Sequence, residues 1–431
     1  MDDIKEFSFV ESLKGELSLP GDKSISHRAV LFSAMAEGTS KISNLSDGED
    51  VKSTRSIMES LGCSFSNEGD TLVVKGVGKN GFKPQTNPIT LDAGNSGTTS
   101  RLLSGILAHQ SFTSVIVGDH SLSQRPMRRV ADPLIEAGAD IKTSEIGSLP
   151  MTISPSNTLK PIKHTLKVAS AQVKSALLLA GLFMDEESLV VEPQPTRNHT
   201  EWMLQMPVKY TQEGGKMIRS SSKYYPKPNE YFVPSDISTA AFYIVFALIS
   251  KNSEIIIKNV SLNPTRTAFL ELLVEMGGDI HIGEMQYSAN EPYADIRVKS
   301  CKLKNVQIPK DIIPEIIDEI PILSLAGLYA EGDFEIRGAE ELRVKESDRI
   351  KALCTNYHKF VENVEEFEDG FALRGTFKND VLLFDSYTDH RIAMTFAIRS
   401  MLNRGGGSVK DFRYVAISNP KFLEQIKSVT E

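Results

Sequence analysis

"VLFSAMAEGTSKIS", residues 30–43, joins an apolar run to a turn of small and charged residues and then to a stretch with β-branched residues. This order predicts a buried helix, a turn and a strand. The same pattern recurs five more times, at intervals of roughly 70–80 residues, which is typical of a repeat architecture. The other copies are SGILAHQSFTSVIV (104–117), LLLAGLFMDEESLVV (177–191), YIVFALISKNSEIII (243–257), LSLAGLYAEGDFEIRG (323–338) and TFAIRSMLNRGGGSV (395–409).

A second type of helix lies between these copies and often ends at a glycine, which is a common C-cap. Regular examples are DVKSTRSIMESLG (50–62), PMRRVADPLIEAG (126–138) and PTRTAFLELLVEMG (264–277), and less regular ones are expected after TRNHTE (196–201), KESDRI (345–350) and SNPKF (418–422). The repeating unit is therefore two helices with several strands. We expect an α/β fold, in the broad sense that includes α+β, with three units in each of two domains and a crossover within residues 220–236.

The bulk composition excludes several classes of protein. A chain of 431 residues is too long for one ordinary core, and its net charge of −8 argues against a nucleic-acid partner. The longest apolar run, AAFYIVFALI (240–249), is about half of what a membrane span needs, and the acidic N-terminus does not resemble a secretory signal. Three separated cysteines without a CxxC favour a reducing compartment, so we expect a cytoplasmic protein. We also expect a monomer without a membrane partner.

The starts of the helices predict the chemistry. Each apolar helix opens with Ser, Asp or Asn, which can cap backbone amides, and a helix start also attracts anions. Capping alone does not explain nearby cations, because the helix dipole disfavours them there. These cations suggest a multiply charged anionic ligand, although Arg101 could be structural, Arg128 and Arg129 could be solvated, and His27 could serve packing. They are Lys23, Arg28, Arg101, Lys174 and Arg391, with Arg125, Arg128, Arg129, Arg197, Lys345 and Arg349 near the second helices.

Two phrases share most of their letters. "GDKSISHR" (21–28) opens an apolar helix, whereas "GDHSLSQR" (118–125) leads into a second-type helix. Because they occupy different places in the repeating unit, we interpret them as two parts of one anion site. No phosphate loop, GxSxG elbow, HExxH or EF-hand motif is found, so the sequence gives no positive support for a metal or nucleotide site.

Six motifs together resemble the 5-enolpyruvylshikimate-3-phosphate synthase family, in the family's order, from about residue 12 to residue 423. They are LPGDKSISHRAVLFSAMAEG, GNSGTTSRLL, GDHSLSQRPM, SAQVKSALLLAGL, EELRVKESDRI and DHRIAM. The resemblance implies a two-domain enolpyruvyl-transferase fold, each domain being three βαβαββ units around buried helices. It places residues 1–20 and 236–431 in one domain and residues 21–235 in the other, with the active site in the cleft between them.

The resemblance also implies a reaction. The enolpyruvyl group of phosphoenolpyruvate would pass to the 5-hydroxyl of shikimate 3-phosphate by addition and elimination, releasing phosphate, with no metal or organic cofactor. This step belongs to the shikimate pathway, which leads to chorismate and the aromatic amino acids. Asp318 would accept the hydroxyl proton, while Lys23 and Glu346 would handle protonation of the methylene carbon and the later elimination.

The same resemblance assigns ligand contacts. The shikimate 3-phosphate set is Lys23, Ser24, Arg28, Ser170, Ala171, Gln172, Arg197, Asp318 and Lys345. The phosphoenolpyruvate set is Lys23, Asn95, Gly97, Arg125, Gln172, Arg349 and Arg391. Gly97 leaves room that a methyl group would fill, which favours sensitivity to glyphosate, an inhibitor that occupies the phosphoenolpyruvate site in this family.

Four positions depart from the family's pattern, and two other functions remain open. Ala171 replaces a common Ser, Asn198 a common Asp, Thr388 the usual Gly, and Ile417 a Lys that some members have. The sister family that uses UDP-N-acetylglucosamine as acceptor usually has a loop Cys, which GDHSLSQRPMRR lacks. A non-catalytic anion-binding relative would need only the cations, yet Lys23, Asp318 and Glu346 are all present.

Overall fold

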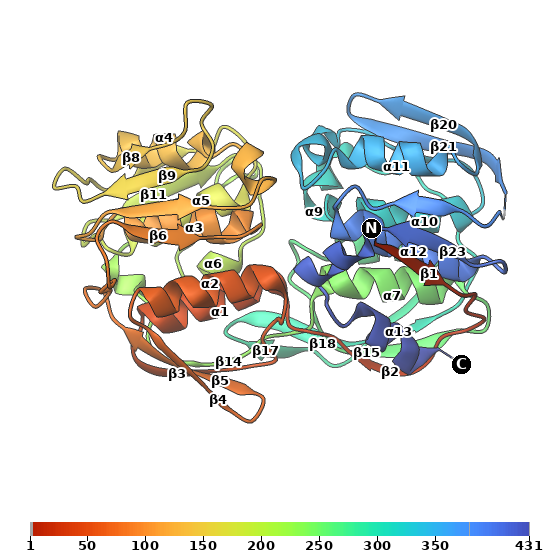
Figure 1. Ribbon diagram of the computed structural model, residues 1–431, viewed down its shortest axis with the longest axis horizontal. Coiled ribbons are helices and arrows are strands. Elements are labelled where there is room, and N and C mark those ends of the chain that lie inside the picture. The colour runs from red at the N-terminus through yellow and green to blue at the C-terminus, as the bar shows by residue number, and fades with distance from the viewer. Residues whose placement is uncertain (1–2, 379, 431) are drawn as a thin grey trace. The chain divides into compact units, whose positions relative to one another are not determined.

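The computed structural model describes residues 3–378 and 380–430 of the chain. By its internal contacts the chain divides into two compact units (Figure 1). Unit 1 comprises Met1–Pro20, Ser235–Gln286 and Pro292–Glu431, and unit 2 comprises Gly21–Pro234 and Tyr287–Glu291. Each unit has its own hydrophobic core.

The helix, turn and strand predicted for the six copies are confirmed at all six positions. The helices are α1 (Lys23–Met35), α3 (Gly97–Leu107), α5 (Ala171–Gly181), α7 (Ile237–Ile249), α10 (Ile320–Tyr329) and α12 (His390–Leu402). The strands that come after them are β3 (Glu37–Ser43), β7 (Ser114–Val117), β11 (Ser188–Glu192), β15 (Glu254–Ser261), β19 (Phe334–Ile336) and β23 (Gly407–Lys410). In α7 every residue from Ile237 to Leu248 is buried, as expected of a helix that is apolar on all sides.

The second helix type is also confirmed, with later starts in two cases. These helices are α2 (Glu49–Ser60), α4 (Arg128–Glu136), α6 (His199–Met203), α8 (Ala268–Glu275), α11 (Arg349–Tyr357) and α13 (Phe422–Val429). We expected α4 to begin at Pro126, but the amides of Met127 and Arg128 donate to the carbonyl of Gly147 instead. Similarly, α8 begins after a turn, where the Arg266 amide donates to the Asn263 carbonyl. A short helix, α9 (Ile313–Ile316), precedes α10.

Unit 2 contains three four-stranded sheets, each with one parallel and two antiparallel pairings. In the second and third of these sheets a helix joins the two parallel strands and a hairpin follows, which gives the βαβαββ order that we expected. In the first sheet, the parallel partner of β3 comes instead from the end of the unit. The sheets run β14 (Glu230–Phe232)–β3–β5 (Thr71–Val77)–β4 (Ser64–Glu68), then β6 (Ile89–Asp92)–β7–β9 (Met151–Ser154)–β8 (Asp140–Lys142), and then β10 (Lys163–Thr165)–β11–β13 (Lys216–Ser220)–β12 (Val208–Tyr210).

Unit 1 has three less regular sheets, and the N-terminal segment completes two of them. Strand β2 (Lys14–Ser18) pairs in parallel with β15, and β1 (Ile4–Phe7) pairs antiparallel with β23. The sheets run β16 (Asp279–Ile282)–β18 (Glu291–Lys299)–β15–β2 with β17 (Gln286–Ser288) beside β18, then β19–β21 (Gly370–Phe377)–β20 (Val361–Phe367), and then β1–β23–β22 (Leu383–Asp385).

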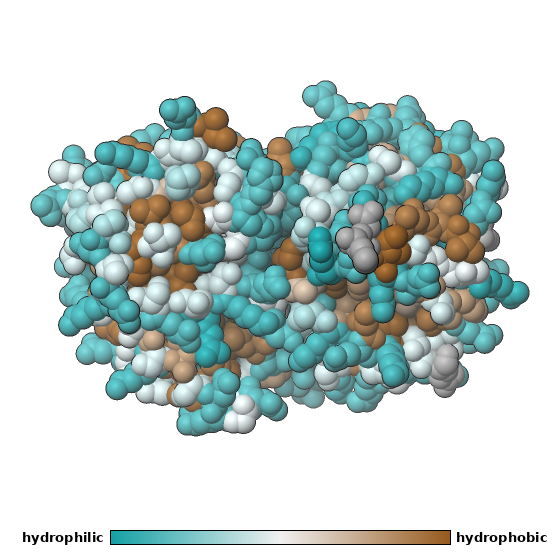
Figure 2. Space-filling model, viewed as in Figure 1, coloured by the Kyte–Doolittle hydropathy of each residue, from teal (hydrophilic) through white to brown (hydrophobic). Residues whose placement is uncertain are grey.

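One short segment and one boundary residue differ from the expected domain division. Ser235 belongs to unit 1, although we expected it with residues 21–234. Residues 287–291 belong to unit 2 by their contacts, although we expected all of 236–431 in the other domain. Two hydrogen bonds attach this segment to unit 2. The Phe232 amide donates to Ser288 Oγ at 3.0 Å, and the Asn290 side-chain amide donates to the Trp202 carbonyl at 3.0 Å. The surface view shows hydrophilic side chains interrupted by hydrophobic patches on the visible face of each unit (Figure 2).

The close approach of α3 and α5 generates a stability prediction. A Cβ at Gly105 would lie 2.0 Å from the carbonyl oxygen of Ala176, so one helix must move. We expect Gly105→Ala to destabilise the protein by about 1–3 kcal/mol or more, despite the better helix propensity of alanine. Urea unfolding measures this, with Ser104→Ala in the same helix as control. Equal unfolding free energies for Gly105→Ala and the wild type would contradict the packing argument.

Candidate active site

The predicted residues divide between the two units. In unit 2 they lie at the N-terminal ends of α1, α3 and α5 and in the loops before α4 and α6. The caps of these helices are side chains: Asp22 Oδ1 accepts the Ile25 amide at 2.9 Å, Ser96 Oγ the Thr99 amide at 3.1 Å, and Ser170 Oγ the Val173 amide at 3.4 Å. The predicted residues in unit 2 are Lys23, Ser24, Arg28, Asn95, Gly97, Arg125, Ser170, Ala171, Gln172 and Arg197; those in unit 1 are Asp318, Lys345, Glu346, Arg349 and Arg391.

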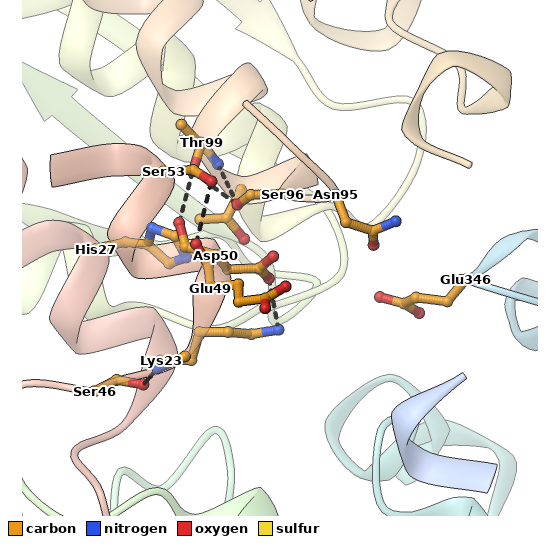
Figure 3. Close-up of polar contacts among 12 residues, drawn as sticks. Lys23, His27, Ser46, Glu49, Asp50, Ser53, Asn95, Ser96, Thr99 and Glu346 are labelled. Atoms are coloured by element: carbon orange, nitrogen blue, oxygen red, sulfur yellow. Dashed lines mark hydrogen bonds and ion pairs between the residues drawn. The ribbon is translucent and has the colours of Figure 1, made fainter. Parts of the chain in front are cut away.

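Lys23 forms an ion pair that the sequence did not reveal. Its Nζ donates to Asp50 Oδ2 at 3.0 Å, and the two side chains are 21% and 8% exposed (Figure 3). Asp50 lies in the first turn of α2, where the helix dipole alone favours an acidic residue. Nothing in the local sequence therefore distinguished Asp50 from an ordinary helix-start carboxylate.

Arg28 is buried and joins three helices of unit 2. Its guanidinium donates to Thr200 Oγ1 at 2.7 Å, to Ser175 Oγ at 2.8 Å and to the Ser24 carbonyl at 2.8 Å. Burial lowers the pKa of Arg28 to about 10, although Glu201 and Glu291 oppose this shift. An arginine has five N–H groups, so these three bonds leave capacity for a ligand anion.

Lys174 corrects an expectation, because it serves the fold rather than a ligand. Its ammonium group is fully buried, 2.9 Å from Glu192 Oε1 and 2.6 Å from Glu201 Oε1. Glu192 Oε2 in turn accepts the amide and the hydroxyl of Thr196, at 3.2 and 2.8 Å. The buried ion pairs therefore anchor the loop that carries Arg197, the neighbour of Thr196.

The loop before α3 holds Arg125 through a relay of side chains. Asn95 Nδ2 donates to Asp119 Oδ2 at 2.6 Å, which turns Asn95 Oδ1 toward Arg125, whose Nη2 lies 2.9 Å away. Asp119 was not among the predicted residues. A Cβ on Gly97 would lie 2.9 Å from Arg101 Nη1, which would have to move, and 3.5 Å from Arg125 Nη1, which is an ordinary contact.

Gln172 connects the starts of α5 and α3. Its Nε2 donates to Thr98 Oγ1 at 2.9 Å, and its Oε1 accepts a hydrogen bond from Arg101 Nη1. Arg101, which the sequence left open between a structural and a ligand role, is therefore engaged with a predicted site residue. Two helix starts and their side chains form one polar surface in unit 2.

In unit 1, predicted residues are in direct contact. Arg349 is 1% exposed and donates to Asp389 Oδ2 at 2.8 Å, to Asp318 Oδ1 at 3.3 Å and to Glu346 Oε2 at 2.6 Å. Although burial lowers the pKa of Arg349, the charges of Asp389, Glu346 and Asp318 raise it above its ordinary value. Arg349 therefore stays a cation and orients the carboxylates of Asp318, Glu346 and Asp389 around it.

Arg391 completes this cluster from the start of α12. Its Nη1 donates to the Asp318 carbonyl at 2.7 Å, and its Nη2 lies 3.9 Å from Asp318 Oδ2. Thr388, the residue before Asp389, has an unusual backbone conformation with φ of 59°. This left-handed conformation is easiest for glycine, which explains why Gly is common at this position. Asp389 nevertheless caps α12 by accepting the Arg391 amide at 2.8 Å.

We expected Asp318 to cap the start of α10, and this prediction is wrong, because no described side chain caps that helix. Glu319 occupies the cap position, but its buried carboxylate accepts the hydroxyl of Ser238 and lies 3.5 Å from Arg266 Nη2. Within residues 3–378 and 380–430, no group of three or more His, Cys, Asp and Glu residues is arranged to hold a metal ion. Over the same residues, no helix combines the length and hydropathy that crossing a membrane requires.

Comparisons with known proteins agree on one family. The family described as EPSP synthase (3-phosphoshikimate 1-carboxyvinyltransferase) matches residues 9–426. The curated 3-phosphoshikimate 1-carboxyvinyltransferase of Petrotoga mobilis is 44% identical, over 98% of this chain and 99% of that protein, and that of Persephonella marina is 44% identical over 99% of both.

Solved structures give the same result. The EPSP synthase of Acinetobacter baumannii has a TM-score of 0.86 and 39% identity, covering 100% of this chain and 98% of that one. The enolpyruvyl transferase NikO of Streptomyces tendae has a TM-score of 0.73 at 14% identity, covering 99% and 96%, which shows similarity of fold alone.

The Lys174 ion pairs predict a pH-dependent loss of stability. Lys174→Met leaves Glu192 and Glu201 buried without their cation, at a cost of about 3–5 kcal/mol. Burial already raises the pKa of Glu192 and Lys174 lowers it, so the variant's folded state will bind protons more readily than its unfolded state. Its stability must then fall as the pH rises, and the deficit relative to wild type should be smaller near pH 5 than near pH 8.

Urea unfolding at both pH values measures this deficit. Lys41→Met is the control, because it breaks only the exposed pair with Glu68 and should cost little stability at either pH. A deficit that grows toward low pH would contradict the role of Lys174 as counter-ion.

Proposed function

The chain belongs to the EPSP synthase family, and from this premise we propose how it performs that family's reaction. It is a 3-phosphoshikimate 1-carboxyvinyltransferase: it transfers the enolpyruvyl group of phosphoenolpyruvate to the 5-hydroxyl of shikimate 3-phosphate and releases phosphate. The observation that carries this conclusion is the 44% identity to curated enzymes of that name over nearly the whole chain.

The cations of unit 2 bind the acidic groups of both substrates. Arg125, oriented by Asn95, forms a fork suited to the carboxylate or phosphate of phosphoenolpyruvate, beside the start of α3 at Gly97. The binding place of shikimate 3-phosphate is lined by Ser24, Arg28, Ser170, Ala171, Gln172 and Arg197. Lys23 contacts both ligands. From unit 1, Asp318 and Lys345 contribute to the acceptor and Arg349 and Arg391 to phosphoenolpyruvate.

The carboxylates of unit 1 and Lys23 move the protons. Asp318 accepts the proton of the 5-hydroxyl as its oxygen attacks the central carbon of the enol. Glu346 or Lys23 delivers a proton to the methylene carbon, which becomes the methyl group of a tetrahedral intermediate. Loss of that proton then expels phosphate and regenerates the double bond, so acid and base exchange roles between the two half-reactions.

Compartment and assembly belong to the same proposal. The protein acts as a cytoplasmic monomer. In support of a reducing compartment, Cys63, Cys301 and Cys354 are all free thiols, and burial raises the pKa of Cys63 and Cys354 to about 12. Such thiols are unreactive, as structural rather than catalytic cysteines are.

The activity is tested by phosphate release from phosphoenolpyruvate with one of two acceptors. We expect release with shikimate 3-phosphate and none with UDP-N-acetylglucosamine. Release with the UDP-sugar alone would assign the chain to the sister reaction. No release with either acceptor from the folded protein would falsify catalysis and leave an anion-binding relative.

The role of Asp318 predicts a separation of turnover from binding. Asp318→Asn keeps an oxygen for Arg349 but cannot accept the hydroxyl proton. We expect kcat to fall about 10²–10⁴-fold, while the dissociation constant of shikimate 3-phosphate changes only a few-fold. Steady-state kinetics and calorimetry measure the two effects, with the exposed Asp333→Asn as control. Losses of equal size in kcat and in affinity would make Asp318 a binding residue only.

A further inference from the structure

Lys23 and Asp50 are the outer of two polar contacts between α1 and α2. His27 lies four residues after Lys23 on α1, and Thr54 lies four residues after Asp50 on α2, so each pair shares a helix face. The outer contact is the Lys23–Asp50 ion pair at 3.0 Å, and the inner contact joins His27 Nδ1 to Thr54 Oγ1 at 2.7 Å. Figure 3 shows His27 on the same helix as Lys23, deeper than the ion pair.

The inner contact continues to a third helix. Thr54 Oγ1 lies 2.7 Å from Thr99 Oγ1, and the Thr99 hydroxyl lies 2.7 Å from Ser96 Oγ, the cap of α3. Both threonine hydroxyls also approach the backbone carbonyl of Asp50, at 3.5 and 3.4 Å. His27, Thr54, Thr99 and Ser96 are all 0% exposed, so this hydroxyl ladder is closed to solvent.

The shortest contacts fix the direction of the protons. The Thr99 hydroxyl donates to Ser96, and the Thr54 hydroxyl then donates to Thr99, because each hydroxyl has one proton. His27 Nδ1 must therefore donate to Thr54, which makes His27 the neutral Nδ1–H tautomer. Among the described residues its Nε2 has no hydrogen-bond partner, and a second N–H at that position would be left unsatisfied.

The charge of His27 matters because Lys23 is one turn away. Burial lowers the pKa of His27 well below its usual value, and the charges of Lys23 and Arg28 lower it further. The partner of His27 is a hydroxyl rather than a carboxylate, so the ladder itself does not favour the imidazolium form. The nearby carboxylate of Asp50 already serves as the counter-ion of Lys23.

We propose that His27, Thr54 and Thr99 are positioning residues, which hold the Lys23–Asp50 pair and the start of α3 in register for phosphoenolpyruvate. This inference rests on the proposed function, in which Lys23 and Gly97 both serve that substrate. A buried polar chain of this kind adds little net stability compared with apolar side chains, but it fixes one arrangement of the helices. The acceptor side of α1 is held independently, because Arg28 is fixed by Thr200 and Ser175.

Thr54→Val tests the ladder, because valine keeps the shape and removes the hydroxyl. We expect kcat/KM for phosphoenolpyruvate to fall at least tenfold, while the dissociation constant of shikimate 3-phosphate stays within twofold. Thr54→Ser should restore most of the activity. Ser33→Ala is the matched control on α1: Ser33 is buried, and its hydroxyl has no hydrogen-bond partner among the described residues.

The outcomes separate the inference from the proposed function. A wild type without turnover would overturn the proposed function and, with it, the role given to the ladder. An active wild type with a Thr54→Val variant no worse than Ser33→Ala would overturn the ladder alone. Equal losses for both substrates, or a serine variant without rescue, would also overturn it, because a merely structural role predicts these results.

A spectroscopic measurement on the wild-type protein does not depend on enzyme activity. In ¹⁵N-histidine-labelled wild-type protein, we expect His27 to show a protonated Nδ1 and a bare Nε2 that stay unchanged from about pH 8 to about pH 5. The signal is assigned by its loss in His27→Asn. A protonated Nε2, or titration in this range, would contradict the ladder as described.

Discussion

The location of the catalytic and binding residues depends on one constraint: the six apolar helices are buried along almost their whole length. In α1 every residue from Ile25 to Met35 is buried, and in α12 every residue from His390 to Met401. Such helices can present functional groups only at their ends, and the N-terminal end attracts anions through its unpaired amides and dipole. Catalytic and binding residues therefore gather at helix starts in both units, and the loops beside those starts supply the remaining cations.

A second constraint is that cations near buried helices need nearby acids. Lys174 is paired with two buried glutamates, Lys23 is paired with Asp50, and Arg349 is paired with three carboxylates. These ion pairs differ in function. The Lys174 cluster is fully buried and can only support a loop, whereas Asp318 and Glu346 are 14% and 19% exposed and remain accessible to a substrate. The degree of burial, which the sequence does not display, separates a structural ion pair from a catalytic one.

The sequence predicted the repeat and most helix and strand types, because hydrophobic periodicity is a local property. It also identified the basic residues of the site, partly through family resemblance. It missed Asp50, Thr54 and Asp119, since an acid at a helix start and a threonine inside a helix each have ordinary local explanations. It placed Lys174 among ligand cations because Glu192 and Glu201 are distant in sequence. It expected Asp318 to cap α10, because it could not show that Arg349 and Arg391, which engage the Asp318 carboxylate, come from later repeats.

The two similar phrases GDKSISHR and GDHSLSQR show how far the local amino-acid sequence determines structure. Their aspartates do the same thing: Asp22 and Asp119 each accept the amide three residues later, from Ile25 and Leu122. The arginines that end the two phrases are placed differently, because Pro126 comes directly after the second phrase and holds Arg125 in an extended conformation, with φ of −81° and ψ of 141°. The first phrase continues as a helix and turns its arginine into the buried contacts with Thr200 and Ser175. The second ends in a short turn and directs its arginine to Asn95, so the same aspartate–amide contact leads to a different placement of the guanidinium group once a proline follows.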